Sequence, residues 1–201
     1  MPSDFILALD VGTSSVRASL YDPQARAVAG MEAKRPYSMR TTPEGGVEGD
    51  APFLLGLLEE AIDEVLARSG AAKISAVACC TFWHSLMGVG VDGSPLTPVY
   101  TWADMRAEPF VPMLRQRMDE KAYHARSGAF FHPLFHPAKY LWLGPTKAAF
   151  WRSFGEWVYE RLFGRALATV SMASGTGMLD VVACRYDEEI LRRVGVREEQ
   201  L

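Results

Sequence analysis

The stretch that most constrains the fold lies near the N-terminus, where FILALDVGTSSVRASLYD (residues 5–22) joins two strand-like runs through a short polar turn. Phe5–Asp10 is apolar until its last residue, and Val16–Asp22 alternates apolar with polar residues, a pattern typical of strands. We expect an antiparallel hairpin with Gly12–Ser14 at its turn. A helix beginning at Gly12 would instead indicate a dinucleotide-binding or P-loop fold.

The residues of this turn have the chemistry of a phosphate-binding loop. Gly12 would let backbone N–H groups approach a phosphate closely, and the hydroxyls of Thr13, Ser14 and Ser15 would add donors. Arg17 would supply a positive charge, and Asp10, at the end of its strand, could hold Mg²⁺ directly or through water. No Lys-Ser/Thr pair follows the glycine, so the pattern is not a P-loop. The spacing alone fits an ordinary Gly/Ser-rich hairpin equally well.

The rest of the pattern predicts an α/β domain. We expect a third strand at Ala27–Arg35, an amphipathic helix from the N-cap Asp50 to about Ser69, and a strand at Ile74–Thr81 that is buried on both faces. Later elements are predicted at Leu86–Val91 (strand), around Met113–Met118 (helix), and at Trp151–Phe163 and Asp187–Val194 (helices). This order favours a central mixed β-sheet flanked by helices.

Composition excludes several classes of protein. The net charge is −3, and no basic stripe suggests nucleic acid. No apolar run is long enough to span a membrane, and no signal peptide is visible in MPSDF, so we expect a cytoplasmic protein. The three cysteines, Cys79, Cys80 and Cys184, fit no metal motif and are expected to be buried, reduced thiols.

The chain resembles a known family at several places. LDVGTSSVRASLYD resembles the first phosphate-binding motif of the actin-like ATPase (ribonuclease H-like) superfold, and its R-A-x-x-x-D ending resembles the FGGY carbohydrate kinases. VEGD, FWHSLMGVGVDG, YTWADMRA and KYLWL follow in the family's order, although His136 replaces the small or hydroxyl residue usual before KYLWL. TWADMR, SGAFFHP and SMASGTGMLD look most like the gluconokinase branch.

The resemblance implies phosphorylation of a sugar or sugar acid hydroxyl, with ATP and Mg²⁺ as cofactors and gluconate as the favoured substrate. Small-molecule sugars would be the partners, without nucleic acid or membrane, and a homo-oligomer stays open. The implied phosphate site comprises Asp10, Gly12, Thr13, Ser14, Ser15 and Arg17, with Asp10 at the metal. The implied substrate site comprises His84, Trp102, Asp104, Arg106 and His132.

Each substrate candidate also has an ordinary explanation. His84 could bind a substrate hydroxyl or be a structural histidine, and Trp102 could be a wall for the carbon chain or plain core. Arg106 could clamp a carboxylate or form a salt bridge within its loop with Asp104. The loops after Thr81 and Tyr100 are expected at one edge of the sheet, where ligand sites of α/β proteins form. Gly175-Thr176-Gly177 is interpreted as a turn or bulge.

The sequence departs from the family at the catalytic base. The family has an Asp in a G-D motif near its second domain, whereas the only G-D pair here is Gly49-Asp50. We therefore expect residues 1–201 to be the N-terminal lobe of a two-lobe kinase, with the base beyond Leu201, the C-terminal lobe absent and no activity alone. The alternatives are a neutral ketose such as xylulose as substrate, a non-kinase actin-like ATPase, and an inactive binding module.

Overall fold

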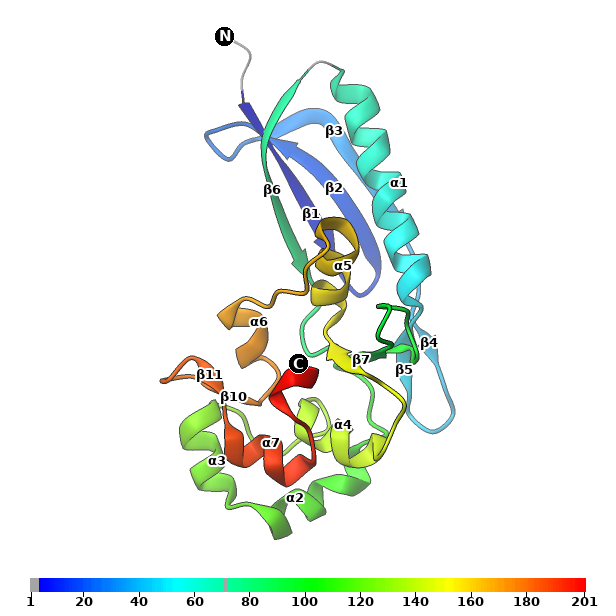
Figure 1. The fold of residues 1–201 in the computed structure, drawn as a ribbon. Helices are drawn as coiled ribbons and strands as arrows, with labels where there is room; N and C mark the ends of the chain where they lie inside the picture. The colour runs from blue at the N-terminus through cyan, green and yellow to red at the C-terminus, as the bar shows by residue number, and fades with distance from the viewer. Residues whose placement is uncertain (1–3, 71) are drawn as a thin grey trace. The chain divides into compact units, whose positions relative to one another are not determined.

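The computed structural model describes residues 4–70 and 72–201, and the chain divides into two compact units (Figure 1). The first unit contains the chain up to Met39 together with Asp50–Phe82. The second contains Arg40–Gly49 and Trp83–Leu201.

The first unit is a four-stranded mixed sheet with one long helix. The strands are β1 (Asp4–Val11), β2 (Ser15–Tyr21), β3 (Ala27–Pro36) and β6 (Lys73–Thr81), in the order β3-β2-β1-β6. β1 runs antiparallel to β2 and parallel to β6. Helix α1 (Ala51–Ser69) packs on β2 and β3. The predicted hairpin, third strand and long helix are all confirmed.

The register of the hairpin separates a buried from an open side of the sheet. Val11 lies opposite Val16, and both are fully buried. Asp10 lies opposite Arg17. Because successive side chains of a strand point to opposite faces, Asp10 and Arg17 share the face away from the valines, at the end of β1 where the turn begins.

The ends of α1 follow from local hydrogen bonding. Asp50 is the N-cap, and its carboxylate accepts from the backbone N–H of Phe53 at 2.8 Å, which satisfies one of the donors that a helix start leaves unpaired. Leu54, Leu58 and Val65 of the helix are almost completely buried. The helix ends at Gly70, whose φ of 58° disfavours other residues.

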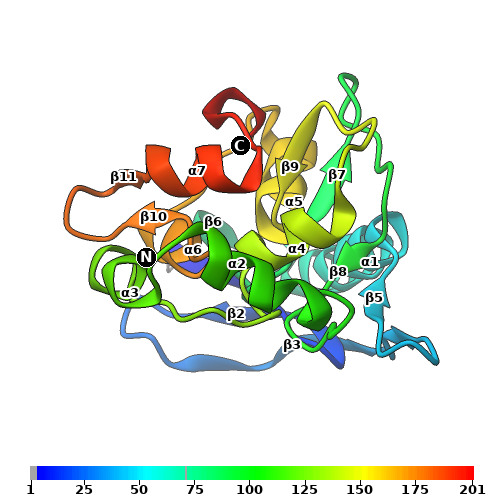
Figure 2. The same ribbon diagram turned by 90° about the horizontal axis from the view of Figure 1, so that it is seen from below.

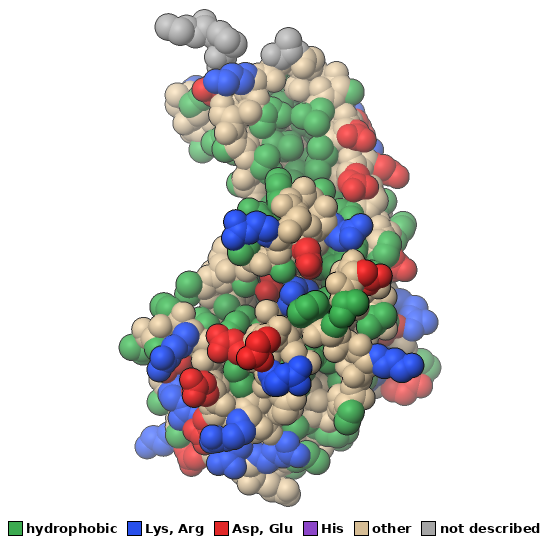
Figure 3. All heavy atoms as spheres, in the orientation of Figure 1, with side chains coloured by type: hydrophobic (Ala, Val, Ile, Leu, Met, Phe, Trp, Pro, Cys, Tyr) green, Lys and Arg blue, Asp and Glu red, His purple; other side chains and the backbone are tan. Residues whose placement is uncertain are grey.

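β6 is not the doubly buried strand that its apolar run predicted. Most of its residues are exposed, including Val77 at 49%, and Cys79 and Cys80 are exposed free thiols, as is Cys184. Both expectations of burial are therefore wrong. The physical reason is that β6 is an edge strand, paired only with β1 among the described residues. Figure 3 shows apolar side chains at the surface over these strands.

The second unit combines small sheets with short helices. Its strands are β4 (Arg40–Thr41), β5 (Val47–Gly49), β7 (Met87–Val89), β8 (Val99–Tyr100), β9 (Phe150–Arg152), β10 (Leu179–Asp180) and β11 (Arg185–Tyr186). They pair as β4-β5-β8, β7-β9 and β10-β11. Its helices are η1 (Glu108–Phe110), α2 (Val111–Arg117), α3 (Glu120–Ser127), α4 (His136–Leu143), α5 (Phe154–Phe163), α6 (Val170–Ser174), α7 (Glu188–Val194) and η2 (Glu198–Gln200). Helices α2, α4 and α7 lie close together (Figure 2) around a core that includes Leu114, Tyr140, Trp151 and Ile190.

Several boundaries in this unit differ from expectation. Trp151 lies in β9, which pairs with β7, and the predicted helix begins only at Phe154. Ser153 sets that start, because it forms a reciprocal capping box with Glu156. β6 and β8 lie in different sheets, so the loops after Thr81 and Tyr100 do not leave one common sheet edge. Among the described residues, no helix is both long and apolar enough to cross a membrane.

Candidate phosphate-binding turn and substrate site

The turn between β1 and β2 is held by hydrogen bonds from several directions. The N–H of Gly12 donates to the carbonyl of Ser15 at 3.0 Å, which closes the turn. Tyr37, just after β3, holds it from outside: its backbone N–H donates to the carbonyl of Ser14 at 3.0 Å, and its hydroxyl donates to the carbonyl of Gly12. The turn backbone is therefore fixed before any ligand binds.

Tyr37 was not singled out from the sequence, because no periodic pattern marks RPYSM. Burial, with a smaller contribution from the charge of Asp10, raises the pKa of Tyr37 to about 12. The hydroxyl therefore remains protonated near neutral pH and keeps its role as donor to Gly12.

The side chains of the turn remain open to solvent. Thr13 and Ser14 are exposed, and within the part of the chain that the structure describes no protein group pairs with their hydroxyls. A fixed backbone with unpaired hydroxyl donors fits a phosphate.

Asp10 and Arg17 lie beside this turn on the open face of the sheet. Asp10 is exposed, and its Oδ1 accepts a weak hydrogen bond from Cys80 Sγ at 3.4 Å. Arg17 Nε lies 4.0 Å from Glu32 Oε2, and no described group forms a hydrogen bond with it. No group of three or more His, Cys, Asp or Glu able to hold a metal occurs in the described ranges. One exposed carboxylate fits Mg²⁺, which usually keeps several waters and binds through one or two carboxylates plus phosphates.

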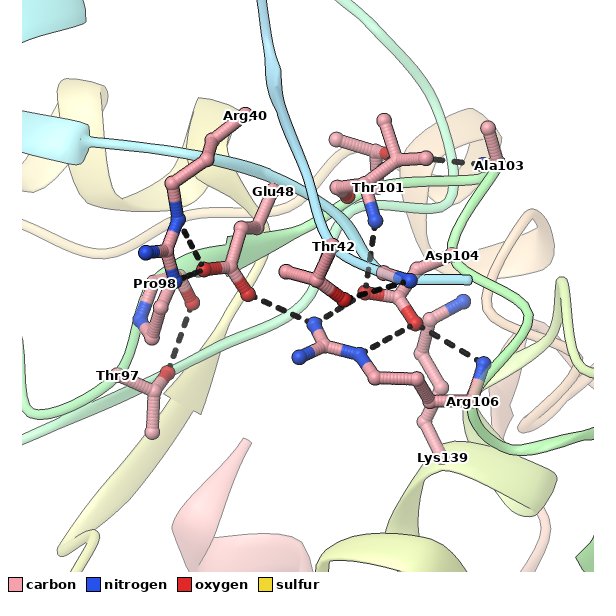
Figure 4. A network of polar contacts seen from close by, with 12 residues as sticks. Arg40, Thr42, Glu48, Thr97, Pro98, Thr101, Ala103, Asp104, Arg106 and Lys139 are labelled. Atoms are coloured by element: carbon pink, nitrogen blue, oxygen red, sulfur yellow. Dashed lines mark hydrogen bonds and ion pairs between the residues drawn. The ribbon is translucent and has the colours of Figure 1, made fainter. Parts of the chain in front are cut away.

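In the second unit, Arg106 is the centre of a buried ionic network (Figure 4). Its Nη2 donates to Glu48 Oε2 at 2.7 Å and to Asp104 Oδ2 at 2.5 Å, and its Nε donates to Asp104 Oδ1 at 3.1 Å. Glu48 and Asp104 are 3% and 1% exposed. Arg40 pairs with the other oxygen of Glu48. The guanidinium also lies over the rings of Trp142 and Tyr100.

This network ties the segment carrying Glu48 to the loop carrying Asp104 and Arg106. Burial alone would raise the pKa of Glu48, but hydrogen bonds from Arg40 and Arg106 outweigh burial and hold it below its ordinary value. The hydrogen bond to Asp104, with that to Glu48, raises the pKa of Arg106. Arg106, which was expected to bind a substrate carboxylate, is therefore already paired with two buried carboxylates. A direct contact between Arg106 and the substrate stays a prediction.

His84 is held in an unusual backbone conformation. Its φ is 58°, a left-handed value uncommon for residues other than glycine, and such strain often accompanies functional sites. Its Nδ1 lies 2.5 Å from the carbonyl oxygen of Gly175, and its ring contacts those of Trp83 and Phe135. Burial lowers the pKa of His84, and the charge of Lys139 adds to that effect, although the bond to Gly175 opposes it.

Lys139 is a fully buried cation that the sequence marked only as part of KYLWL. Its Nζ donates to the carbonyls of Pro133 at 2.8 Å and Leu134 at 2.9 Å. Burial lowers the pKa of Lys139 to about 8, although the negative charge of Asp104 opposes this. The ammonium thus fastens the loop before α4, and it lies next to the Arg106 network in Figure 4.

The remaining candidates are placed less tightly. Trp102 is 49% exposed, so it is not a core residue. His132 is half-buried, and its Nδ1 accepts from the N–H of Leu134 at 3.1 Å. His136 begins α4, with Pro137 in the first turn where proline is tolerated. His136 is buried, and its Nε2 forms a hydrogen bond with the carbonyl of Ser85.

The mixed sheet flanked by a helix, whose first hairpin carries a fixed, hydroxyl-rich turn, belongs to the actin-like ATPase fold class. The comparisons with known proteins show the family. The N-terminal domain of the FGGY family of carbohydrate kinases matches residues 5–201, and the chain belongs to this family.

Individual relatives agree with this assignment. The chain is 24% identical to a gluconokinase of Bacillus subtilis over 99% of its own length and 40% of that protein. Among solved structures, gluconate kinase from Lactobacillus acidophilus matches with a TM-score of 0.90 and 31% identity, covering 99% of this chain and 41% of that one. Ligand-bound xylulose kinase from the same organism gives the same TM-score and identity, covering 98% and 41%.

Proposed function

We propose that this chain supplies the N-terminal lobe of an ATP-dependent kinase that phosphorylates a hydroxyl of a sugar or sugar acid, with gluconate as the favoured substrate. The observation that carries the proposal is the β1–β2 turn, whose backbone is fixed by Tyr37 while the hydroxyls of Thr13 and Ser14 stay unpaired. Such a turn can donate hydrogen bonds to a phosphate without rearranging its backbone.

The first unit would bind the phosphates of ATP. The turn at Gly12–Ser15 would donate hydrogen bonds to phosphate oxygens, and Arg17 would add positive charge. Asp10 would hold Mg²⁺, which when bound neutralises phosphate charge. The second unit would bind the sugar through His84, Trp102 and the Arg106 loop. The catalytic base and adenosine site are expected outside residues 1–201.

Gluconate is favoured by the relatives named as gluconokinases, whereas one structural observation favours a neutral ketose such as xylulose. Arg106 is already paired with Glu48 and Asp104, so its charge is largely neutralised. If Arg106 nevertheless binds the carboxylate of gluconate, Arg106→Ala should weaken the binding of gluconate on the order of 30-fold and the binding of xylulose less. The reason is that a charge-assisted bidentate contact contributes roughly 2–4 kcal/mol to binding. Equal, small effects on both sugars would support the purely structural ion pair.

Two measurements test the proposal. A coupled ATPase assay on residues 1–201 should show no turnover with gluconate above the uncatalysed background. In the same chain, gluconate or xylulose should change the fluorescence of the tryptophans near the proposed site, and His84→Ala should abolish that change. His124→Ala is the matched control, because His124 is an exposed histidine on α3. A fluorescence response that survives in His84→Ala, or no response to either sugar, would contradict the substrate assignment.

A further inference from the structure

The environment of His84 determines which of its ring nitrogens carries the proton. Nδ1 lies 2.5 Å from the carbonyl oxygen of Gly175. A carbonyl can only accept a hydrogen bond, so Nδ1 must be the donor. In a neutral imidazole, Nε2 then has a lone pair and no proton. Among the described residues no group pairs with Nε2, and His84 is only half-buried.

The close approach of the Gly175 carbonyl depends on the absence of a side chain there. A Cβ at Gly175 would lie 2.8 Å from Cε2 and Nε1 of Trp83, closer than real Cβ atoms come. Trp83 precedes His84 and packs beside its ring, with the ring centroids 5.1 Å apart. Gly175 therefore leaves room for the Trp83 ring that packs beside His84.

The charged and titratable groups around His84 disfavour a second proton on its ring. Lys139 of α4 carries a buried positive charge that acts on His84. His136, also on α4, is fully buried, and its Nε2 bonds the carbonyl of Ser85. The other neighbours in contact with the His84 ring, Trp83 and Phe135, are uncharged. No carboxylate is paired with His84 in the described chain, and burial outweighs the bond to the Gly175 carbonyl, which would favour an imidazolium.

We propose that Gly175 is a positioning residue that keeps His84 in the Nδ1–H tautomer, so that Nε2 accepts a hydrogen bond from a substrate hydroxyl. The hydroxyl contact rests on the proposed function. It defines the chemistry at this point of the sugar: an acceptor nitrogen selects a hydroxyl and repels a carboxylate or a keto oxygen, which have no proton to donate. The carboxylate of a sugar acid must then lie away from His84.

The tautomer can be measured without any ligand. Nitrogen-15 NMR of the histidine side chains in residues 1–201, followed from pH 8 to pH 5, distinguishes protonated from unprotonated Nδ1 and Nε2. We expect the Nδ1–H form of His84 at pH 7, with a titration midpoint below the ordinary value. An Nε2–H form, or a doubly protonated ring at pH 7, would overturn the proposal.

Two variants separate the effect of the Gly175 carbonyl from the effect of the Lys139 charge. Gly175→Ala should let the Nε2–H form appear, because the new Cβ displaces Trp83 and weakens the bond to the carbonyl. Lys139→Met removes the charge at similar length and should move the His84 midpoint upward while keeping the tautomer. Gly56→Ala in α1 is the matched glycine control, since nothing lies within 4 Å of a Cβ there. An unchanged tautomer in Gly175→Ala would contradict the role of Gly175, and an unchanged midpoint in a folded Lys139→Met would exclude the Lys139 charge as a cause of the lowered midpoint.

Adding gluconate or xylulose tests the hydroxyl contact separately. A hydrogen bond from a hydroxyl should shift the Nε2 resonance of His84 and leave Nδ1 nearly unchanged. His84→Asn retains a donor near the Nδ1 position and loses the acceptor at Nε2, so sugar affinity should fall by about tenfold or less, as expected for one neutral hydrogen bond. The Nδ1–H tautomer together with no response to either sugar would refute the proposed function and the hydroxyl contact, but not the tautomer.

Discussion

Replacing Arg106 with alanine tests whether this residue acts mainly on the stability of the second unit. The substitution removes the cation shared by Glu48 and Asp104. Glu48 keeps its pair with Arg40. Among the described residues, Asp104, which is 1% exposed, keeps only backbone donors, including the N–H of Val47 at 3.3 Å. The substitution therefore leaves a buried carboxylate without an ion-paired partner, with the Lys139 ammonium as the remaining nearby positive charge.

The expected loss follows from the burial of that carboxylate. Breaking a buried ion pair by removing one partner costs about 3–5 kcal/mol. We take the lower end, about 3 kcal/mol, because Glu48 retains Arg40 and the Arg106 side chain is itself 18% exposed. With a urea m-value on the order of 2 kcal/mol/M, the unfolding midpoint should fall by roughly 1.5 M.

Tryptophan fluorescence during urea unfolding measures this loss in the correct unit. All five tryptophans of the chain, Trp83, Trp102, Trp142, Trp151 and Trp157, lie in the second unit. Arg115→Ala is the matched control, since Arg115 pairs with Glu120 at the surface and should change stability by less than about 1 kcal/mol.

Adding Asp104→Asn identifies the cause of the loss. If the unpaired carboxylate is responsible, Arg106→Ala combined with Asp104→Asn should be more stable than Arg106→Ala alone. A midpoint for Arg106→Ala no lower than that of the Arg115→Ala control would refute the structural role and would favour a guanidinium available to the substrate.

Three further predictions concern other parts of the chain. Gly46→Ala should destabilise the second unit in the same fluorescence assay, because its Cβ would lie 2.7 Å from Cζ of Arg106; unchanged stability would show that the network shifts freely. Tyr37→Phe removes the hydrogen bond from the Tyr37 hydroxyl to the Gly12 carbonyl and should lower the local stability of the β1–β2 turn by about 1 kcal/mol. Amide hydrogen exchange in the turn should then be faster; exchange equal to wild type would show that Tyr37 does not hold the turn in place. Burial lowers the pKa of His136 to about 3, so the unfolded chain takes up a proton at this residue before the folded chain does. The second unit should therefore lose stability as the pH falls from about 6.5 toward 3, and His136→Gln should flatten that dependence; a slope equal to wild type in a folded variant would exclude His136 as its cause.

The first unit could be predicted from the sequence because its signals are local. Strand alternation, the glycine-containing turn and the Asp50 cap each act within a few residues. The exposure of β6 could not be predicted, since an apolar run is the same whether neighbours cover the strand or it lies at an edge.

The candidate site was predictable only in part, for a related reason. The TWADMR segment drew attention to Arg106, but nothing local shows that its guanidinium bonds Glu48, 58 residues earlier. The pairing of His84 with the carbonyl of Gly175 spans 91 residues. Because every residue has a backbone carbonyl, the sequence does not show which carbonyl accepts a hydrogen bond. Tyr37 and Lys139 were missed for the same reason, because both act on carbonyl groups.

The open edge of β6 has a consequence for how this chain behaves at high concentration. Charged residues and prolines normally protect an edge strand from pairing with another molecule. Along Lys73–Thr81 only the first residue is charged and none is a proline. Within the described chain its outer backbone groups are unpaired and are a template for a strand from a second chain. Residues 74–81 have the short, uncharged, β-prone character of sequences that stack into fibrils. The exposed Cys79 and Cys80 could then link adjacent chains covalently under oxidising conditions. Strand β6, which positions Asp10 through its pairing with β1, is thus the segment of the first unit most prone to aggregation.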